Sequence, residues 1–300
     1  MTDRLTCLLV IVLALLVATA ARAEPETVYF KSADGATDIV AYLFRPAGGG
    51  PHPAIVLLHG RACPYSANDN RDCTLVARGV RSDCNAATLS KRHQMWGELW
   101  ADHGVLALLP DSFGPRGKAY GFGRFTHDDP DREDVNEKTV RPLDAEGAFA
   151  YLRDRTDAKQ IFLQGWSNGG STALNVMIRQ GAKQEAAVMG DPRRHQADGF
   201  RAALVFYPGC GKEALLDDKV MTRTPIAMFM GTADEEVSSL KCQEVVNRSI
   251  GTTFAVSLYI GATHDFDDLD EKRQSVPANV TAKADAMAKA ARMIDGFSTR

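Results

Sequence analysis

The sequence predicts an α/β fold built on a doubly wound, mostly parallel sheet with helices on both faces. Short apolar segments recur along the chain, and segments compatible with helices separate them. Strands that lack polar alternation are typical of a sheet covered on both faces. No segment is rich enough in Pro and Gly to separate two domains, so residues 24–300 are expected to form a single domain.

The order of the elements follows from these apolar segments. Residues 27–30 and 39–44 are expected to open the sheet as an antiparallel pair, because the turn residues Asp34 and Gly35 lie between them. The remaining strands are expected at 54–58, 105–109, 161–164, 202–207, 226–230 and 256–260, and helices at 95–102, 134–155, 171–180, 237–249 and 280–297.

Two long insertions interrupt the alternation. Residues 61–91 follow the third expected strand and hold three cysteines, and residues 114–133 follow the fourth strand and are rich in Gly, Arg and Asp. Loops after parallel strands gather at the carboxyl edge of the sheet, where ligands bind. Both insertions are therefore expected to border a pocket, and surface decoration is the alternative interpretation.

The first 23 residues have the features of a secretory signal. Arg4 precedes an apolar run at 7–18, and the Ala-Arg-Ala sequence at 21–23 matches the small-residue pattern of a cleavage site. The run is shorter than the roughly 20 residues that a membrane-spanning helix needs. We expect removal of residues 1–23 and a periplasmic or secreted protein without stable membrane association; an uncleaved anchor is the alternative.

The overall composition narrows the function class. The chain has 45% hydrophobic and 24% charged residues, which is typical of a globular protein. A formal net charge of −3 does not favour nucleic acid or a membrane surface as a partner. The cysteines and histidines lack the spacing of a zinc site, so neither a metal nor a cofactor is expected.

Five cysteines follow the predicted signal, and cysteines of exported proteins are expected to pair. Cys210 and Cys242 are expected just past neighbouring strand ends, and we hypothesise a disulfide between them. Two of Cys63, Cys73 and Cys84 would then join within their own loop, and one cysteine would be left over.

The strongest functional pattern is Gly-Trp-Ser-Asn-Gly at 165–169. An apolar run of strand type precedes it, and a helix-compatible segment follows at once. A serine on such a strand-to-helix turn holds its hydroxyl clear of the backbone, and the glycines on either side let neighbouring backbone approach. This context predicts that Ser167 is a nucleophile; an ordinary glycine-rich turn is the alternative.

A serine nucleophile needs a base, normally an imidazole that a carboxylate holds in place. Asp234 follows the strand expected at 226–230, and His264 follows the strand expected at 256–260. Hydrolases whose serine lies on a strand-to-helix turn have the same order of nucleophile, acid and histidine along the chain. Glu235 and Glu236 adjoin Asp234 and are alternatives for the acid, but Asp234 is nearest the strand end.

The tetrahedral intermediate of such a reaction needs two backbone N–H groups for its oxyanion. One is expected from Asn168, directly after the nucleophile, and the other from Arg61, in the loop after the third strand. His59 is expected to brace that loop rather than to transfer protons. The side chains of Arg61, Arg116 and Trp166 are candidates for substrate binding, and solvated arginines are the alternative.

With these residues placed, the chain resembles the α/β-hydrolases and, within them, the dienelactone hydrolase family. The resemblance covers nearly all of residues 24–300 and implies an eight-stranded sheet and hydrolysis through an acyl-enzyme. The enzymes that give the family its name use cysteine as nucleophile, whereas this chain has Ser167 at that place. The resemblance rests on the opening hairpin and on LLHG at 57–60, LPDSFG at 109–114, GWSNGG at 165–170, GTAD at 231–234 and THDF at 263–266.

These features predict an exported serine hydrolase that cleaves small-molecule carboxylic esters, with lactones as a further candidate class of substrate. A serine peptidase or amidase would use the same three residues, and the sequence does not separate the two. A non-catalytic binding protein on the same scaffold is a third class, but such proteins usually lack one member of the triad. The sequence carries no information on oligomeric state.

Overall fold

The computed structural model describes residues 24–66, 73–126, 129–190, 199–212, 215–216 and 219–298. The predicted signal at 1–23 lies outside the described residues. Within the described part of the chain, no helix combines the length and the apolar character that a membrane crossing requires.

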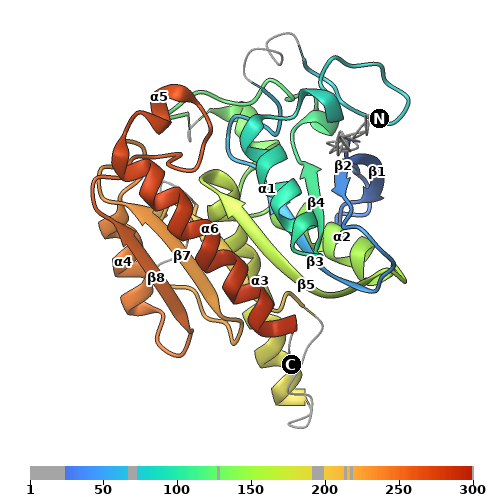
Figure 1. Cartoon of the computed structure of the whole chain (residues 1–300). Coiled ribbons are helices and arrows are strands. Elements are labelled where there is room, and N and C mark those ends of the chain that lie inside the picture. The colour runs from blue at the N-terminus through green and yellow to red at the C-terminus, as the bar shows by residue number, and fades with distance from the viewer. Residues whose placement is uncertain are drawn as a thin grey trace, which may run out of the picture.

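The described strands form one eight-stranded sheet in the order β1-β2-β4-β3-β5-β6-β7-β8 (Figure 1). The pairs β1–β2 and β2–β4 are antiparallel, and the other neighbours are parallel. The predicted opening hairpin and mostly parallel sheet are thus confirmed. The strands are β1 (Glu26–Lys31), β2 (Asp38–Phe44), β3 (His52–Leu58), β4 (Leu106–Asp111), β5 (Ala158–Trp166), β6 (Ala203–Phe206), β7 (Ile226–Gly231) and β8 (Phe254–Tyr259).

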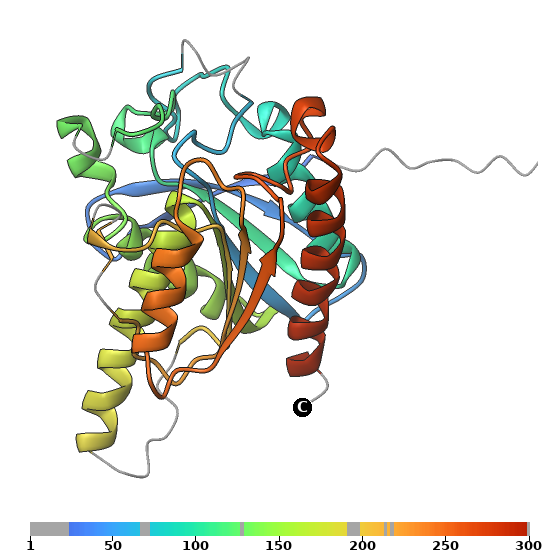
Figure 2. The same ribbon diagram turned by 90° about the vertical axis from the view of Figure 1, so that its left-hand side faces the viewer.

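Helices cover both faces of the sheet, as Figure 2 shows with the sheet between two helical layers. On one face, α1 (Lys91–Asp102) and α6 (Pro277–Ser298) pack against the strands, with Trp96 and Trp100 buried. On the other face lie α2 (Arg141–Arg153), α3 (Asn168–Gly190) and α4 (Ser239–Arg248). A parallel sheet sandwiched in this way buries both sides of each strand, which explains the continuous apolar runs.

The helix expected at 134–155 is shorter in the structure, where α2 spans Arg141–Arg153. Residues Pro130–Val135 form a separate 3₁₀ turn instead. The Asn136 side chain accepts hydrogen bonds from the N–H groups of Lys138 and Thr139, which favours a turn over a helix. Pro142 then stands in the first turn of α2, where its missing N–H costs nothing.

The two insertions pack against each other at the carboxyl edge of the parallel strands. The Phe122 N–H donates to the Arg61 carbonyl at 2.9 Å, and the Ala119 N–H donates to the Thr74 carbonyl at 2.9 Å. A backbone bond from Val76 to Gly114 adds a third link. The insertions therefore form one layer beside the active-site residues, and they are more than independent surface loops.

Two disulfides are present among the described residues. Cys210 is joined to Cys242, as predicted, and this bond links the segment after β6 to α4. Cys73 is joined to Cys84 within the first insertion. Cys63 is buried and belongs to neither disulfide.

We expect the Cys210–Cys242 disulfide to contribute about 3–4 kcal/mol to the free energy of unfolding, because it closes a loop with a sequence separation of 32 residues. The double variant Cys210→Ser/Cys242→Ser should unfold at lower denaturant concentration than the wild type. Cys73→Ser/Cys84→Ser, which opens a shorter loop of separation 11, should lose less. Equal midpoints for wild type and both variants would contradict this account.

Candidate active site

Ser167 sits at the turn between β5 and α3, and its backbone is left-handed, with φ of 51°. Few non-glycine residues adopt such a φ, and they often mark functional sites. The turn is tight because a Cβ added at Gly169 would lie 2.0 Å from the Leu58 carbonyl oxygen, and one at Gly165 would lie 2.2 Å from the Gly169 oxygen. Glycine at both places is therefore a steric requirement of the turn.

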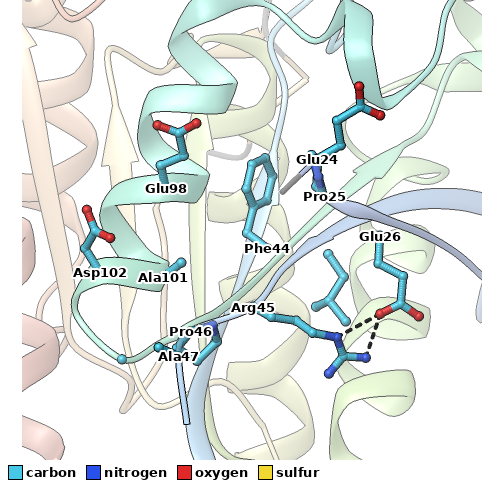
Figure 3. Close-up of a pocket in the computed structure, with 12 residues that line it drawn as sticks. Glu24, Pro25, Glu26, Phe44, Arg45, Pro46, Ala47, Glu98, Ala101 and Asp102 are labelled. Carbon is cyan, nitrogen blue, oxygen red and sulfur yellow. Dashed lines mark hydrogen bonds and ion pairs between the residues drawn. The ribbon is translucent and has the colours of Figure 1, made fainter. Parts of the chain in front are cut away.

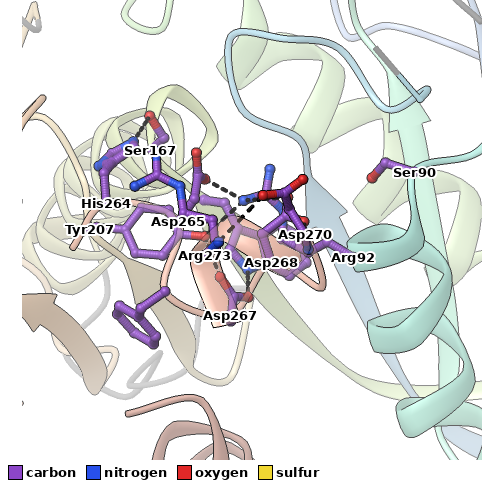
Figure 4. A network of polar contacts seen from close by, with 12 residues as sticks. Ser90, Arg92, Ser167, Tyr207, His264, Asp265, Asp267, Asp268, Asp270 and Arg273 are labelled. Carbon is purple, nitrogen blue, oxygen red and sulfur yellow. Dashed lines mark hydrogen bonds and ion pairs between the residues drawn. The ribbon is translucent and has the colours of Figure 1, made fainter. Parts of the chain in front are cut away.

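The structure brings the three residues selected from the sequence into one hydrogen-bonded line. The Ser167 Oγ lies 3.0 Å from His264 Nε2 (Figure 4). On the other side of the ring, His264 Nδ1 lies 2.8 Å from Asp234 Oδ2. With Nδ1 protonated, the imidazole donates to the carboxylate and accepts from the serine hydroxyl. His264 is 1% exposed, so water does not compete for these bonds.

Asp234 is held in place by the backbone that follows it. Its Oδ1 accepts hydrogen bonds from the N–H groups of Glu236 at 2.8 Å and Val237 at 2.9 Å, which leaves Oδ2 for His264. Glu235 binds the His264 backbone N–H at 3.1 Å instead. The two alternative acids of the sequence are thus occupied elsewhere, and neither accepts from Nδ1.

The charges around His264 determine its proton affinity. Burial by itself disfavours the imidazolium, but the nearby Asp265 carboxylate, the hydrogen bond with Asp234 and the charge of Glu236 outweigh it. The pKa of His264 is therefore raised above its ordinary value.

The loop after β3 lies directly beside the nucleophile. A Cβ at Gly60 would lie 3.7 Å from the Ser167 Cβ. Neither the Arg61 nor the Asn168 backbone N–H has an acceptor within the part of the chain that the structure describes. Asn168 directly follows the nucleophile and Arg61 directly follows Gly60, so both remain candidates for the oxyanion-binding groups. His59 braces the loop as expected: it is fully buried, and its Nε2 accepts from the Ser112 N–H at 3.2 Å.

Arg141 ties the two candidate oxyanion loops together, and the sequence pattern did not identify it. Its guanidinium donates to the Asn168 side-chain oxygen and, at 2.7 Å, to the His59 carbonyl. Burial lowers the pKa of Arg141 to about 10, with Glu137 and Asp144 acting in the opposite direction, so it remains charged at neutral pH. Arg141 is the first residue of α2, and this helix packs against β3 and α3, the elements that adjoin the two loops.

A small cavity of about 30 Å³ opens beside Ser167. Its walls come from both insertions and from the segments that follow β5, β6 and β7. Arg61 lies in this wall, but its guanidinium is already paired with Glu236 at 2.9 Å. The lining residues are Arg61, Phe125, Arg132, Ser167, Asn168, Ser171, Gly209, Glu236 and Val237.

Two of the predicted substrate-binding residues do not reach this cavity, and their assignment is corrected. The Arg116 guanidinium is paired with the buried Asp144 at 2.8 Å and also binds the Ser112 carbonyl. The Trp166 indole is fully buried, and its N–H donates to Asp267 at 3.0 Å. Trp166 is the last residue of β5, and side chains of a strand point alternately to the two faces of the sheet, so its indole lies in the buried layer between sheet and helices.

A larger cavity of about 470 Å³ lies at the opposite edge of the sheet (Figure 3). It lies between the start of β1, the end of β2 and the end of α1, and it includes Glu24, Arg45, Glu98 and Asp102. The parallel strands begin at this edge, whereas active sites of open α/β sheets lie where the strands end. The smaller cavity beside Ser167 is therefore the candidate site.

One group of metal-binding residue types occurs near the site among the described residues. Single donor atoms of Glu236, His264 and Asp265 lie within 4.8 Å of one another. Each carboxylate is already paired with an arginine, Glu236 with Arg61 and Asp265 with Arg92. We therefore interpret the group as ion pairs around the imidazole rather than as a metal site.

The dienelactone hydrolase family profile matches residues 88–298, which is more than half of the chain. The chain belongs to the dienelactone hydrolase family. No protein with curated annotation matches it in sequence. Membership in this family makes the protein an α/β-hydrolase, in agreement with the sheet order and the turn at Ser167.

Several solved structures share the fold. A putative dienelactone hydrolase from Klebsiella pneumoniae has a TM-score of 0.62 at 13% identity, with 90% of this chain and 98% of that chain covered. The dienelactone hydrolase-like promiscuous phosphotriesterase P91, from metagenomic libraries, has a TM-score of 0.58 at 16% identity, covering 90% and 97%. Thermogutta terrifontis esterase 2, phosphonylated by cyclosarin, has a TM-score of 0.55 at 18% identity, covering 92% and 96%.

Gly169→Ala should lower both stability and activity, because its Cβ would collide with the carbonyl oxygens of Leu58, the last residue of β3, and of His59, which follows it. Displacing the first turn of α3 also moves the Asn168 N–H. Gly296→Ala is the matched control, since nothing lies within 4 Å of a Cβ there and alanine favours the helix by about 1 kcal/mol. Thermal unfolding and ester turnover of both variants test this prediction; equal behaviour of the two would contradict it.

Proposed function

We propose that this protein is an exported serine hydrolase that cleaves small carboxylic esters through an acyl-enzyme. The observation that carries the proposal is the line of hydrogen bonds from Ser167 through His264 to Asp234. Family membership gives the reaction class, and the small cavity beside Ser167 gives a place for the acyl group.

In the proposed mechanism, His264 Nε2 takes the Ser167 proton as the hydroxyl oxygen attacks the acyl carbon. Asp234 fixes the imidazole tautomer and stabilises the imidazolium. The backbone N–H groups of Arg61 and Asn168 hold the negative charge of the tetrahedral oxygen. The imidazolium then protonates the leaving alcohol, and water, activated by the same imidazole, releases the acid and regenerates the serine.

Export is part of the proposal and rests on different observations. The signal pattern at residues 1–23 predicts transport out of the cytoplasm. The two disulfides fit an oxidising compartment, since structural disulfides are rare in the cytosol.

Ser167→Ala should reduce kcat on an acyl ester by about a thousandfold or more while the protein remains folded, because no other hydroxyl occupies its place. A fluorophosphonate probe should label the wild type and leave this variant unlabelled. Ser275→Ala, an exposed serine with no part in the site, is the matched control and should keep full turnover. Ester turnover by Ser167→Ala near the wild-type rate would exclude the mechanism.

The size of the cavity predicts a preference for short acyl groups. A space of about 30 Å³ accommodates a methyl or ethyl group and is too small for a longer alkyl chain. We expect kcat/KM for an acetyl ester to exceed that for the hexanoyl ester of the same alcohol by about tenfold or more. Val237→Ala shortens a side chain in the wall and so enlarges the cavity, which should reduce the difference in kcat/KM between the two esters. Faster turnover of the hexanoyl ester would contradict the prediction, and a matching amide separates esterase from amidase activity.

A further inference from the structure

Three carboxylates surround the imidazole of His264, which is more than a single orienting acid requires. Asp234 binds Nδ1, and Glu236 Oε2 lies 3.8 Å from Nε2. Single oxygens of Glu236 and Asp265 and a ring nitrogen of His264 all lie within 4.8 Å of one another. Figure 4 shows His264 and Asp265 of this group. So much negative charge favours the imidazolium, and a protonated histidine cannot act as the base that activates Ser167.

A buried arginine from a distant part of the chain compensates the charge of Asp265. Arg92, in the first turn of α1, donates to the Asp265 carboxylate and, at 3.1 Å, to the Tyr207 hydroxyl. It also lies 3.7 Å from Asp268. The Arg92 side chain is 10% exposed and that of Asp265 is 24% exposed, so solvent screens this pair only in part.

The same contacts position the histidine loop. Asp265 follows His264 directly and has a left-handed backbone, with φ of 55°. The Tyr207 ring, which Arg92 also binds, lies 4.7 Å from the His264 ring between centroids. Two residues further on, the fully buried Asp267 accepts from Tyr207, Trp96 and Trp166. None of these contacts transfers a proton in the proposed mechanism.

We propose that Arg92 and Asp265 are a positioning pair that acts on the proton affinity of His264 in opposite directions and so determines the pH range in which the enzyme works. The pair rests on the proposed function, because it acts through the base of that reaction. Arg92 cancels part of the Asp265 charge, and the remaining charge stabilises the imidazolium that forms when Ser167 attacks. Removing either partner should therefore change the proton affinity of His264, in opposite directions.

Other charged and titratable groups also lie near His264. Glu235 and Glu236 come from the loop after β7, where Arg273 pairs with Glu235 and Arg61 pairs with Glu236. The Tyr207 hydroxyl, beyond β6, is neutral, because burial raises the pKa of this tyrosine well above its ordinary value. These groups are unchanged in the variants below, so they do not alter the expected direction in which the His264 pKa moves.

The test is the pH dependence of kcat/KM for a short acyl ester. In the wild type, activity should fall as the pH drops through the His264 pKa, above the ordinary value of about 6.5. Asp265→Asn removes a negative charge and should move this acid limb to lower pH by about 0.5–1 unit. Arg92→Gln leaves Asp265 uncompensated and should move the limb to higher pH.

Further variants distinguish a change in the proton affinity of His264 from a failure of the variant to fold. Asparagine tolerates left-handed backbone, so Asp265→Asn should fold normally. Arg92→Lys should retain most of the wild-type dependence of kcat/KM on pH. The acid limb of the double variant Arg92→Gln/Asp265→Asn should lie between those of the two single variants. Glu146→Gln, which breaks a remote ion pair with Arg179, is the control and should leave the acid limb unchanged.

NMR titration of the His264 ring in the Ser167→Ala background measures the same shifts without turnover. Opposite displacements in Asp265→Asn and Arg92→Gln support the pair. An unchanged limb in both variants, or displacement in the same direction, would overturn it. A wild type that cleaves no ester contradicts the proposed function instead, and the NMR titration then still decides whether the pair controls His264.

Discussion

The left-handed backbone of Ser167 is the constraint on which the rest of the site depends. Such a conformation costs a non-glycine residue about 1–2 kcal/mol and persists only where the surroundings impose it. Here the Ser167 N–H is bound by the Phe206 carbonyl at 3.0 Å, and the Ser167 carbonyl accepts the Ser171 N–H at 2.9 Å. The serine is thus fixed between the end of β5, its neighbour β6 and the first turn of α3. From this position its hydroxyl lies 3.0 Å from His264 Nε2.

Arginines connect the loops that surround this serine. Arg141 joins the Asn168 side chain to the loop after β3, and Arg61 joins that loop to Glu236 beyond β7. Arg92 joins α1 to Asp265 in the loop after β8. Each of these loops carries one functional group, and loops lack the regular hydrogen bonding of strands. A guanidinium offers five donors in a fixed plane, so one side chain can fix two loops at once. The relative positions of the functional groups therefore depend on these ionic contacts as well as on the sheet.

The sequence predicted those features whose physical cause lies within a few residues of the pattern itself. Apolar runs predicted the strands because both faces of a parallel sheet are buried, and the strand ends then located Ser167, Asp234 and His264. The helix expected at 134–155 was too long because its apolar periodicity does not reveal the turn at Asn136. Partners far apart in the chain were not predictable, since Arg92 and Asp265 are separated by 173 residues and only the fold brings them together. For the same reason Arg116, which the sequence offered as a ligand for substrate, proved to be the partner of Asp144.

Three consecutive acids, Asp234, Glu235 and Glu236, illustrate how the backbone assigns different tasks to similar side chains. The short side chain of Asp234 is locked by two N–H groups of its own turn, so its free oxygen meets His264 Nδ1 at a fixed distance. Glu235 reaches the backbone of the histidine loop and the half-buried Arg273. Glu236 turns to the cavity, where Arg61 neutralises it. Because each residue leaves the turn in a different direction, exchanging any two of them would remove one of these contacts without restoring another. Their order along the chain is thus as much a part of the site as their charge.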